Sequence, residues 1–135
     1  MSEIVLDTDI LSAVMRKNPV VISKARAYLA EHGRFTFSIL TRYEILRGLK
    51  AKGAVKQAVV FDRFCARNVI LPIIDEAVVK AAEIYADLSE RGELIGDADI
   101  LIAASALVHG LGIVTNNEEH FKRIEGLKVE NWLIG

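Results

Sequence analysis

Residues 96–110 of this sequence read GDADILIAASALVHG. After Asp99 nearly every residue is apolar or small, and a helix that is apolar on all sides belongs in a protein core. Asp97 fits the position of a helix cap, because helix N-termini favour short acidic side chains. Asp99 follows inside the first turn. It either serves the helix start in the same way or faces an acidic pocket shared with other elements.

The composition predicts one folded domain over residues 1–135. Hydrophobic residues make up 52% of the chain, which is enough to form a core. No apolar run is long enough to span a membrane, and the N-terminus lacks the pattern of a signal peptide. Cys65 is the only cysteine, so the chain cannot form an internal disulfide or a thiolate zinc cluster. We therefore expect a soluble cytoplasmic protein.

Charge is distributed unevenly along the chain, although the net charge is only −1. Residues 1–67 hold twelve Lys and Arg against six Asp and Glu. Arg42, Arg47 and Lys50 belong to a basic run that continues to Arg67. Such a run can bind a phosphate-rich partner. The alternative is an ordinary pair of solvated helix faces.

Short apolar runs alternate with helical patterns along the whole chain. The runs predict strands at residues 3–6, 34–38, 69–73, 112–115 and 128–130. The patterns between them predict helices at about residues 9–15, 19–32, 42–52, 54–67, 75–91, 98–109 and 118–124. This alternation is typical of an α/β fold with a central, mostly parallel sheet flanked by helices.

Polar residues follow two of the predicted strands. Asp7 stands at the carboxyl end of the first strand, and Thr115 and Asn117 follow the fourth. In parallel α/β folds, ligands bind outside the carboxyl ends of the strands. If both strands lie near the centre of the sheet, these groups converge with Asp99 at one edge.

Glu44 is a further acidic candidate, on the helix that follows the second strand. A residue in that position also lies at the carboxyl edge of the sheet. The alternative is local, because Thr41 and Glu44 have the spacing of a capping box. At the end of the first strand, Thr8 or Asp9 is in position to cap the next helix.

Carboxylates gathered at one site repel each other and raise one another's pKa values. A divalent cation relieves this repulsion, and hard oxygen ligands select Mg²⁺ or Mn²⁺. Such an ion can lower the pKa of bound water and stabilise a leaving oxygen. His32, His109 and His120 are not spaced as metal ligands, so we interpret them as surface or helix-end residues. Hydrolysis of a phosphodiester is the chemistry that fits.

Five motifs follow one another in the sequence: LDTDIL at 6–11, YEILRG at 43–48, IGDADILIAA at 95–104, VTNNEEHF at 114–121 and IEGLKVENW at 124–132. Their order and spacing resemble the PIN-domain ribonucleases, and specifically the VapC-type toxins of VapBC toxin–antitoxin modules. The resemblance spans about residues 3–133. It implies a PIN-like fold and an endoribonuclease that depends on Mg²⁺ or Mn²⁺.

The resemblance also implies roles for individual residues. Asp7, Glu44 and Asp99 correspond to the catalytic acids that hold the metal. The fourth acidic position of the family falls on Asn117, whose neutral side chain can hold a metal-bound water but cannot act as a base. Asp97 is an additional carboxylate that either assists or caps the helix.

Further implications concern partners. Thr8 and Thr115 would donate hydroxyl hydrogen bonds to phosphate or to metal-bound water. The family implies an RNA substrate, a homodimer and a cognate VapB-type antitoxin that covers the acidic pocket. Arg42, Arg47 and Lys50 would contact the RNA or the antitoxin.

Two other functions stay open on the sequence alone. Asp7-Thr8-Asp9 matches the opening Asp-x-Asp of haloacid dehalogenase-type phosphatases, in which Asp7 would be a covalent nucleophile. Leu11 stands where that family has threonine, and short motifs often match by chance. Because Asn117 replaces an acid, the chain could also be a PIN-like module that binds RNA or protein without cleaving it.

Overall fold

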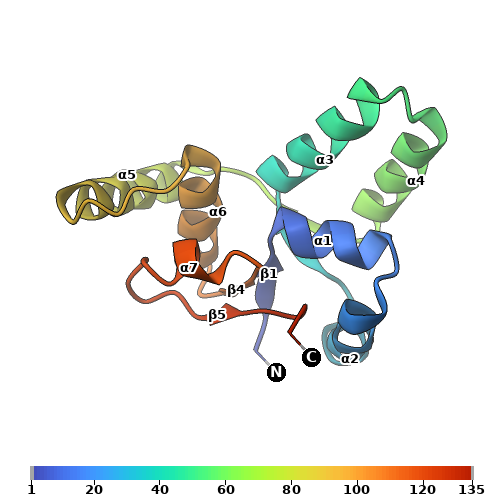
Figure 1. Cartoon of the computed structure of the whole chain (residues 1–135), viewed down its shortest axis with the longest axis horizontal. Helices are drawn as coiled ribbons and strands as arrows, with labels where there is room; N and C mark the ends of the chain where they lie inside the picture. Colours follow the sequence, from blue (N-terminus) through green and yellow to red (C-terminus); the bar gives the residue numbers. More distant parts are fainter. Residues whose placement is uncertain (1, 135) are drawn as a thin grey trace.

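The computed structural model describes residues 2–134 and contains a five-stranded parallel sheet (Figure 1), with the strand order β3-β2-β1-β4-β5. The strands are β1 (Ile4–Leu6), β2 (Thr36–Ser38), β3 (Val69–Leu71), β4 (Gly112–Val114) and β5 (Val129–Glu130). Each is one or two residues shorter than its predicted segment. The predicted α/β class with a parallel sheet is confirmed.

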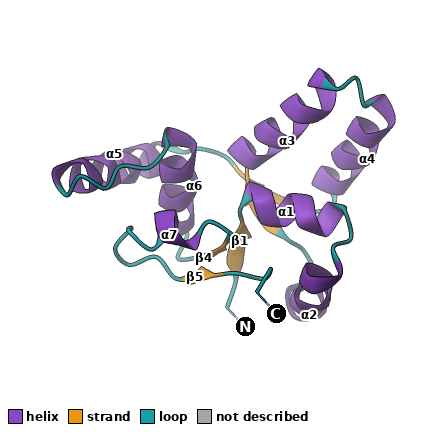
Figure 2. Ribbon diagram, in the orientation of Figure 1, coloured by secondary structure: helices purple, strands orange, loops and turns teal. Residues whose placement is uncertain are grey.

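Helices connect the strands and cover the sheet (Figure 2). They are α1 (Thr8–Met15), α2 (Pro19–His32), α3 (Ile39–Ala51), α4 (Val55–Ala66), α5 (Asp75–Glu90), α6 (Asp97–Val108) and α7 (Glu118–Phe121). As predicted, Pro19 opens α2, and Gly33 ends it in the left-handed conformation with φ 81°. None of the helices within residues 2–134 is both long and apolar enough to cross a membrane.

Strand β1 lies at the centre of the sheet, and its side chains alternate between two hydrophobic clusters. Ile4 and Leu6 pack in the cluster that includes residues of α1, α2 and α4. Val5 points to the opposite face, into the cluster formed largely by α5 and α6. Because β1 is covered on both faces, its sequence is an uninterrupted apolar run.

The order of the strands reverses direction at β1. The chain passes from β1 to β2 and β3 on one side, and later returns to β4 on the other. Leu6 is paired with Phe37 of β2 and with Val114 of β4. Such a reversal opens a crevice at the carboxyl ends of the two central strands. Asp7 and Thr115, the next residues along β1 and β4, are therefore neighbours at this crevice.

Helix α6 corresponds to the apolar helix predicted after Gly96. Ile102, Ala103 and Ala104 are fully buried, as the absence of a polar face predicted. The helix packs along α5 and against β4, and its small side chains allow this close approach. Its first turn carries Asp97 and Asp99, and the charge of Asp99 acts on Asp7 at the crevice.

Helix α3 begins at Ile39, earlier than predicted. The hydroxyl of Ser38 accepts a hydrogen bond from the Leu40 N–H at 3.0 Å and caps the helix. Thr41 therefore lies inside the helix, and the alternative interpretation of Thr41 and Glu44 as a capping box is wrong. The side chain of Glu44 is free to take part in tertiary contacts.

Two further helix starts differ from the prediction by one or two residues. The carboxylate of Asp7 caps α1 by accepting a hydrogen bond from the Thr8 N–H, so neither Thr8 nor Asp9 is the cap. Gly96 occupies the cap position of α6, and Asp97 is its first helical residue. Acidic side chains within the first turn still interact favourably with the helix dipole.

Candidate active site

The carboxylate of Asp7 is buried at the junction of β1 and β4, with 6% of the residue exposed. The Asp7 N–H donates to the Val114 carbonyl at 2.9 Å, which continues the pairing of the strands. Its Oδ2 accepts a 2.7 Å hydrogen bond from the Thr115 hydroxyl, and its Oδ1 accepts one from the Thr8 N–H at 2.9 Å. The two central strands thus hold this carboxylate in one orientation.

The electrostatic surroundings of Asp7 disfavour its charged form. Burial raises the pKa of the Asp7 carboxyl to about 7, and the nearby charges of Asp9 and Asp99 act in the same direction. The hydrogen bonds from Thr115 and Thr8 only partly offset this rise in pKa. A buried acid beside two other acids is a place where a bound cation lowers the energy of the ionised form.

Asp99 lies in the first turn of α6 and is half-buried, with 28% of its side chain exposed. Burial raises the pKa of its carboxyl, and the charge of Glu44 adds to this rise. His120 opposes the rise, because its Nδ1 lies 3.6 Å from Asp99 Oδ2. Asp99 therefore interacts electrostatically both with Asp7, at the end of β1, and with Glu44 on α3.

Glu44 reaches the same region from α3. Its Oε1 accepts a 2.7 Å hydrogen bond from the hydroxyl of Thr8, the residue that follows Asp7. The hydroxyl oxygens of Thr8 and Thr41 lie 3.1 Å apart, and Thr41 is fully buried. Thr8 therefore contacts Glu44 in this structure, where the sequence predicted a contact with phosphate or metal-bound water.

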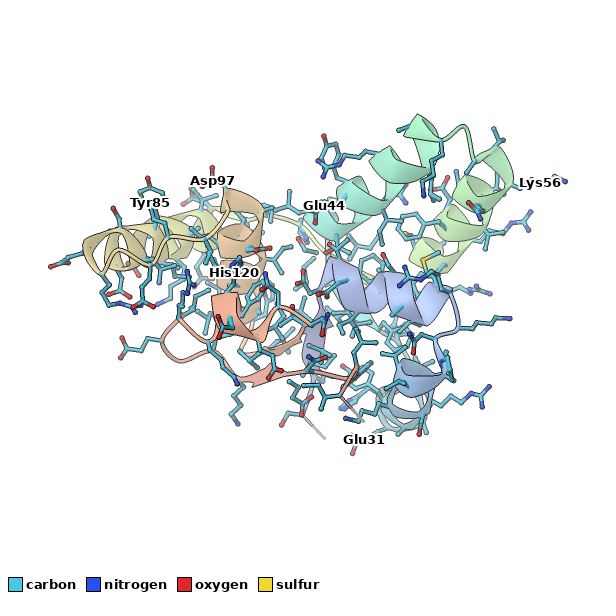
Figure 3. The ribbon with its side chains drawn as sticks, viewed as in Figure 1. Glu31, Glu44, Lys56, Tyr85, Asp97 and His120 are labelled. Carbon is cyan, nitrogen blue, oxygen red and sulfur yellow. The ribbon has the colours of Figure 1, made fainter. Side chains whose placement is uncertain are left out.

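The loop after β4 contributes the remaining polar groups. The Asn117 N–H donates to the Thr115 hydroxyl oxygen at 2.9 Å. The side-chain amide of Asn117 lies 2.8 Å from His120 Nδ1. His120 lies in the last turn of α7, as predicted, and this contact places it next to both Asn117 and Asp99. Figure 3 shows Glu44 and His120 in the middle of the molecule and Lys56 at its edge.

Asp9 is a second residue whose contacts the sequence did not predict. Its Oδ2 accepts a 3.0 Å hydrogen bond from the Asn116 N–H, and burial raises the pKa of its carboxyl. The alternation of Asp7 and Asp9 at the end of a predicted strand is the sequence signal that could have identified it. Asp97 differs, because its side chain is exposed and makes no hydrogen bond or ion pair within residues 2–134.

The acidic groups fit a cation that retains much of its own hydration. Among residues 2–134, no three His, Cys, Asp or Glu side chains stand close enough to enclose a metal ion by themselves. Mg²⁺ does not need such an enclosure, since it is bound through one or two carboxylates and keeps several waters. The all-oxygen donor set and the buried charge of Asp7 match this mode of binding.

The predicted basic contacts fall into two groups. Arg42 is engaged within the fold: its Nη1 lies 2.9 Å from Asp62 Oδ1 and 3.2 Å from Cys65 Sγ, and its guanidinium lies 5.8 Å from the Phe61 ring centroid. Lys50 is exposed. Arg47 is also exposed and lies over the ring of Tyr43, with 5.3 Å between guanidinium and ring centroid. Arg47 and Lys50 are thus available to a partner, and Arg42 joins α3 to α4.

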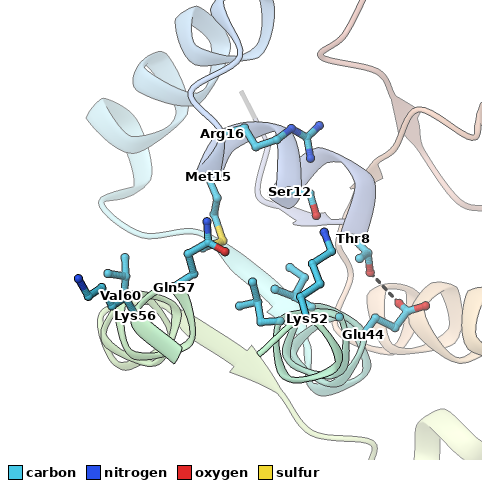
Figure 4. Close-up of a pocket in the computed structure, with 12 residues that line it drawn as sticks. Thr8, Ser12, Met15, Arg16, Glu44, Lys52, Lys56, Gln57 and Val60 are labelled. Carbon is cyan, nitrogen blue, oxygen red and sulfur yellow. Dashed lines mark hydrogen bonds between the residues drawn. The ribbon is translucent and has the colours of Figure 1, made fainter. Parts of the chain in front are cut away.

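A groove of about 540 Å³ runs from the acidic site between α1, α3 and α4. Thr8 and Glu44 form one end, with their hydrogen bond drawn in Figure 4, and Lys56 and Val60 form the other. Its remaining walls combine apolar and basic side chains, among them Met15, Ile45, Leu49, Arg16 and Lys52. The groove therefore joins a negative end to a basic and apolar channel.

Comparisons with known proteins agree with this architecture. Residues 4–127 match the PIN domain family. Ribonuclease VapC2 of Haemophilus influenzae is 33% identical over 134 residues, which cover 98% of this chain and 100% of that protein. The tRNA(fMet)-specific endonuclease VapC of Shigella flexneri is 29% identical over 133 residues, covering 98% of this chain and 99% of that one.

Solved structures show the same fold. A chain of the DNA-bound VapBC complex of Salmonella typhimurium superposes with a TM-score of 0.84 at 28% identity, covering 98% of this chain and 99% of that chain. A chain of VapBC2 of Rickettsia felis, bound to a promoter DNA fragment, gives a TM-score of 0.83 at 29% identity, covering 95% and 97%. These matches leave the dehalogenase alternative without support. The chain belongs to the PIN-domain family and, within it, to the VapC ribonucleases.

Proposed function

We propose that this chain is a divalent-metal-dependent endoribonuclease that acts as the toxin of a type II toxin–antitoxin pair. The observation that carries the proposal is the buried Asp7 carboxylate, whose pKa is raised by burial and by the neighbouring Asp9 and Asp99 charges. Relatives that share nearly the full length are named ribonucleases and an endonuclease. Placement in the cytoplasm stays a prediction from the sequence.

Asp7 and Asp99 would hold a Mg²⁺ or Mn²⁺ ion, with Glu44 binding its water. When bound, the metal would lower the pKa of a coordinated water and stabilise negative charge on the leaving oxygen. The Thr115 hydroxyl fixes Asp7 Oδ2, and the Thr8 hydroxyl fixes Glu44 Oε1. These hydrogen bonds orient the carboxylates before RNA arrives, which reduces the cost of organising the site.

Asn117 occupies the position of a fourth acid but remains neutral at every pH. It can orient a water molecule or a phosphate oxygen through its amide, and it cannot accept a proton as a base. Its contact with His120 Nδ1 holds the amide at the edge of the site, near Asp99. We propose Asn117 as an orienting residue of the cleavage reaction, and Asp97 as an exposed helix-start acid.

The exposed cations of α3 provide a surface for the RNA backbone. Arg47 and Lys50 lie on the same helix as Glu44, which brings positive charge close to the acidic site. Phosphates next to the scissile bond can then be neutralised outside the carboxylate cluster. Arg42 contributes indirectly, by fixing α3 against α4 through Asp62.

A VapB-type antitoxin is the second proposed partner. The solved relatives are toxin–antitoxin complexes, and the groove between α1, α3 and α4 offers an apolar channel that ends at Glu44. An antitoxin segment with an apolar stripe would fill the channel, and a cationic side chain at its end would meet Glu44. The homodimer implied by the family is tested by measuring the molar mass of the antitoxin-free protein by light scattering.

A cleavage assay tests the proposed activity. Purified, antitoxin-free protein is incubated with total RNA in EDTA, and Mg²⁺ or Mn²⁺ is then added back. We expect discrete fragments only after the metal is restored. The second candidate function is a non-catalytic module, which Asn117 favours. Metal-independent RNA binding by a folded protein that yields no fragments would replace the first function by the second.

A further inference from the structure

A hydrogen bond between Asp9 and Asn116 joins two segments that are 107 positions apart in the chain. Asp9 lies in the first turn of α1, and Asn116 lies in the loop between β4 and α7. We propose that Asp9 is a positioning residue that fixes residues 115–117 at the active site, and that this positioning depends on the hydrogen bond and not on the charge of Asp9. The inference rests on the proposed ribonuclease function.

The helix start does not account for the orientation of Asp9. Asp7 already caps α1. Asp9 Oδ1 accepts a 2.7 Å hydrogen bond from the Ile10 N–H, which is a local contact at the helix start. Oδ2 makes a tertiary contact instead and accepts a hydrogen bond from the Asn116 N–H at 3.0 Å. An acid that only complemented the helix dipole would leave this second oxygen in water.

The Asn116 N–H lies just beyond the end of the pairing between β4 and β5. The preceding residue, Thr115, still donates its N–H to the Glu130 carbonyl at 2.9 Å, so pairing between the strands extends to Thr115. Beyond Thr115 the pairing ends, and the Asn116 N–H has Asp9 as its acceptor. The side-chain oxygen of Asn116 accepts an exposed hydrogen bond from the Asn131 amide at 3.1 Å.

The residues on either side of Asn116 belong to the site. Thr115 donates its hydroxyl to Asp7 Oδ2 at 2.7 Å, and the Asn117 amide lies 2.8 Å from His120 Nδ1. The Asn117 N–H also donates to the Thr115 hydroxyl oxygen at 2.9 Å. A displacement of Asn116 would therefore move both Thr115 and Asn117. Displacements of about 1 Å at an active site can lower rates on the order of 100-fold.

Three substitutions separate the hydrogen bond from the charge. Asp9→Asn removes the charge but keeps a carbonyl oxygen that can accept from Asn116. Asp9→Glu keeps the charge but moves the oxygens by one methylene. Asp9→Ala removes both. The matched control is Glu83→Ala, which replaces an exposed acid of α5 with 64% of its side chain accessible and a long, 3.8 Å contact to Lys80.

The first readout is the hydrogen-exchange rate of the Asn116 backbone amide, which NMR measures in the absence of metal and RNA. The second is RNA cleavage at saturating Mn²⁺, with thermal melting as a check of the fold. We expect Asp9→Ala and Asp9→Glu to speed Asn116 exchange at least tenfold and to slow cleavage on the order of 10- to 100-fold. Asp9→Asn and Glu83→Ala should stay within a few-fold of wild type in both measurements.

The proposal would be overturned if Asp9→Glu kept wild-type amide exchange and cleavage while Asp9→Asn lost them, because that result would assign the effect to charge. Unchanged Asn116 exchange in Asp9→Ala would overturn it as well. If Asp9→Ala does not fold, the comparison of Asp9→Asn with Asp9→Glu still decides between hydrogen bond and charge. If wild type cleaves no RNA under any metal condition, the proposed function fails, and amide exchange alone still tests the contact.

Discussion

The hydroxyl of Thr8 donates a 2.7 Å hydrogen bond to Oε1 of Glu44 and links the first turn of α1 to α3. Because Thr8 directly follows Asp7, the bond links the Glu44 side chain to the backbone segment that carries Asp7. The contact lies at the mouth of the groove between α1, α3 and α4 (Figure 4). Glu44 is thus oriented by the same turn that orients Asp7.

Replacing Thr8 by valine, which has nearly the same shape, should release Glu44. We expect RNA cleavage to fall about tenfold, which corresponds to about 1.4 kcal/mol, near the lower end of the range for a hydrogen bond to a charged group. Thr8→Ser keeps the hydroxyl and should stay close to wild type. Cleavage rates under single-turnover conditions provide the measurement. A loss in Thr8→Ser with wild-type cleavage in Thr8→Val would show that the methyl group, and not the hydroxyl, matters.

The raised pKa of Asp7 predicts how stability depends on pH without metal. The carboxyl binds its proton up to about pH 7 in the folded protein, but only up to about pH 3.8 when unfolded. Stability should therefore decrease as pH rises from about 4 to 7, by roughly 4 kcal/mol at most, and then level off. Asp7→Asn removes this decrease.

Urea unfolding in EDTA, at several pH values between 4 and 8, checks this expectation. The difference between Asp7→Asn and wild type isolates Asp7 from the other acids. The variant should be more stable than wild type at pH 8 and inactive toward RNA. A difference that stays constant across the pH range would show that Asp7 ionises normally in the fold.

Ser105 offers a test of the core. Ser105 is fully buried in α6, and its hydroxyl has no hydrogen-bond partner within residues 2–134. Ser105→Ala removes this unpaired group and favours the helix, so we expect the free energy of unfolding to rise by about 1 kcal/mol. The melting temperature should increase by roughly 3 °C. A decrease would indicate that the hydroxyl has a partner in solution.

The salt dependence of RNA binding should distinguish the role of Lys50 from that of Arg42 on α3. Lys50→Ala is expected to weaken RNA binding uniformly and to reduce the slope of log affinity against log salt by about one. Arg42→Ala should instead lower the melting temperature, because it removes the contacts with Asp62 and Phe61. Binding is measured on the catalytically inactive Asp99→Asn background. A salt slope that Lys50→Ala leaves unchanged would place the RNA elsewhere.

Much of the fold could be predicted from local sequence. The apolar run after Asp99 predicted a buried helix, and Pro19 and Gly33 predicted the ends of α2. The start of α3 was misplaced because Ser38 and Thr41 are both good caps, and only the structure shows that Ser38, the last residue of β2, is the cap used. Local propensity could not decide between them.

The acidic site was predictable where residues follow strands. Asp7 and Thr115 meet because the strands that precede them are paired, which a parallel sheet with central β1 and β4 requires. The contacts of Asp9 and His120 depend on how the loop after β4 folds back over α1 and α6. No periodicity of the sequence encodes that loop, so these contacts required the three-dimensional structure.

The most direct measurement compares Asp99→Asn with Asp97→Asn in metal-dependent cleavage of total RNA. Both substitutions remove one carboxylate from the first turn of α6, but Asp99 faces the site and Asp97 is exposed. The account predicts discrete Mg²⁺- or Mn²⁺-dependent fragments from wild type and from Asp97→Asn. It predicts that Asp99→Asn cleaves RNA at least about 100-fold more slowly, which is the usual order of effect when a catalytic group is removed. Cleavage by Asp99→Asn at the wild-type rate would contradict it.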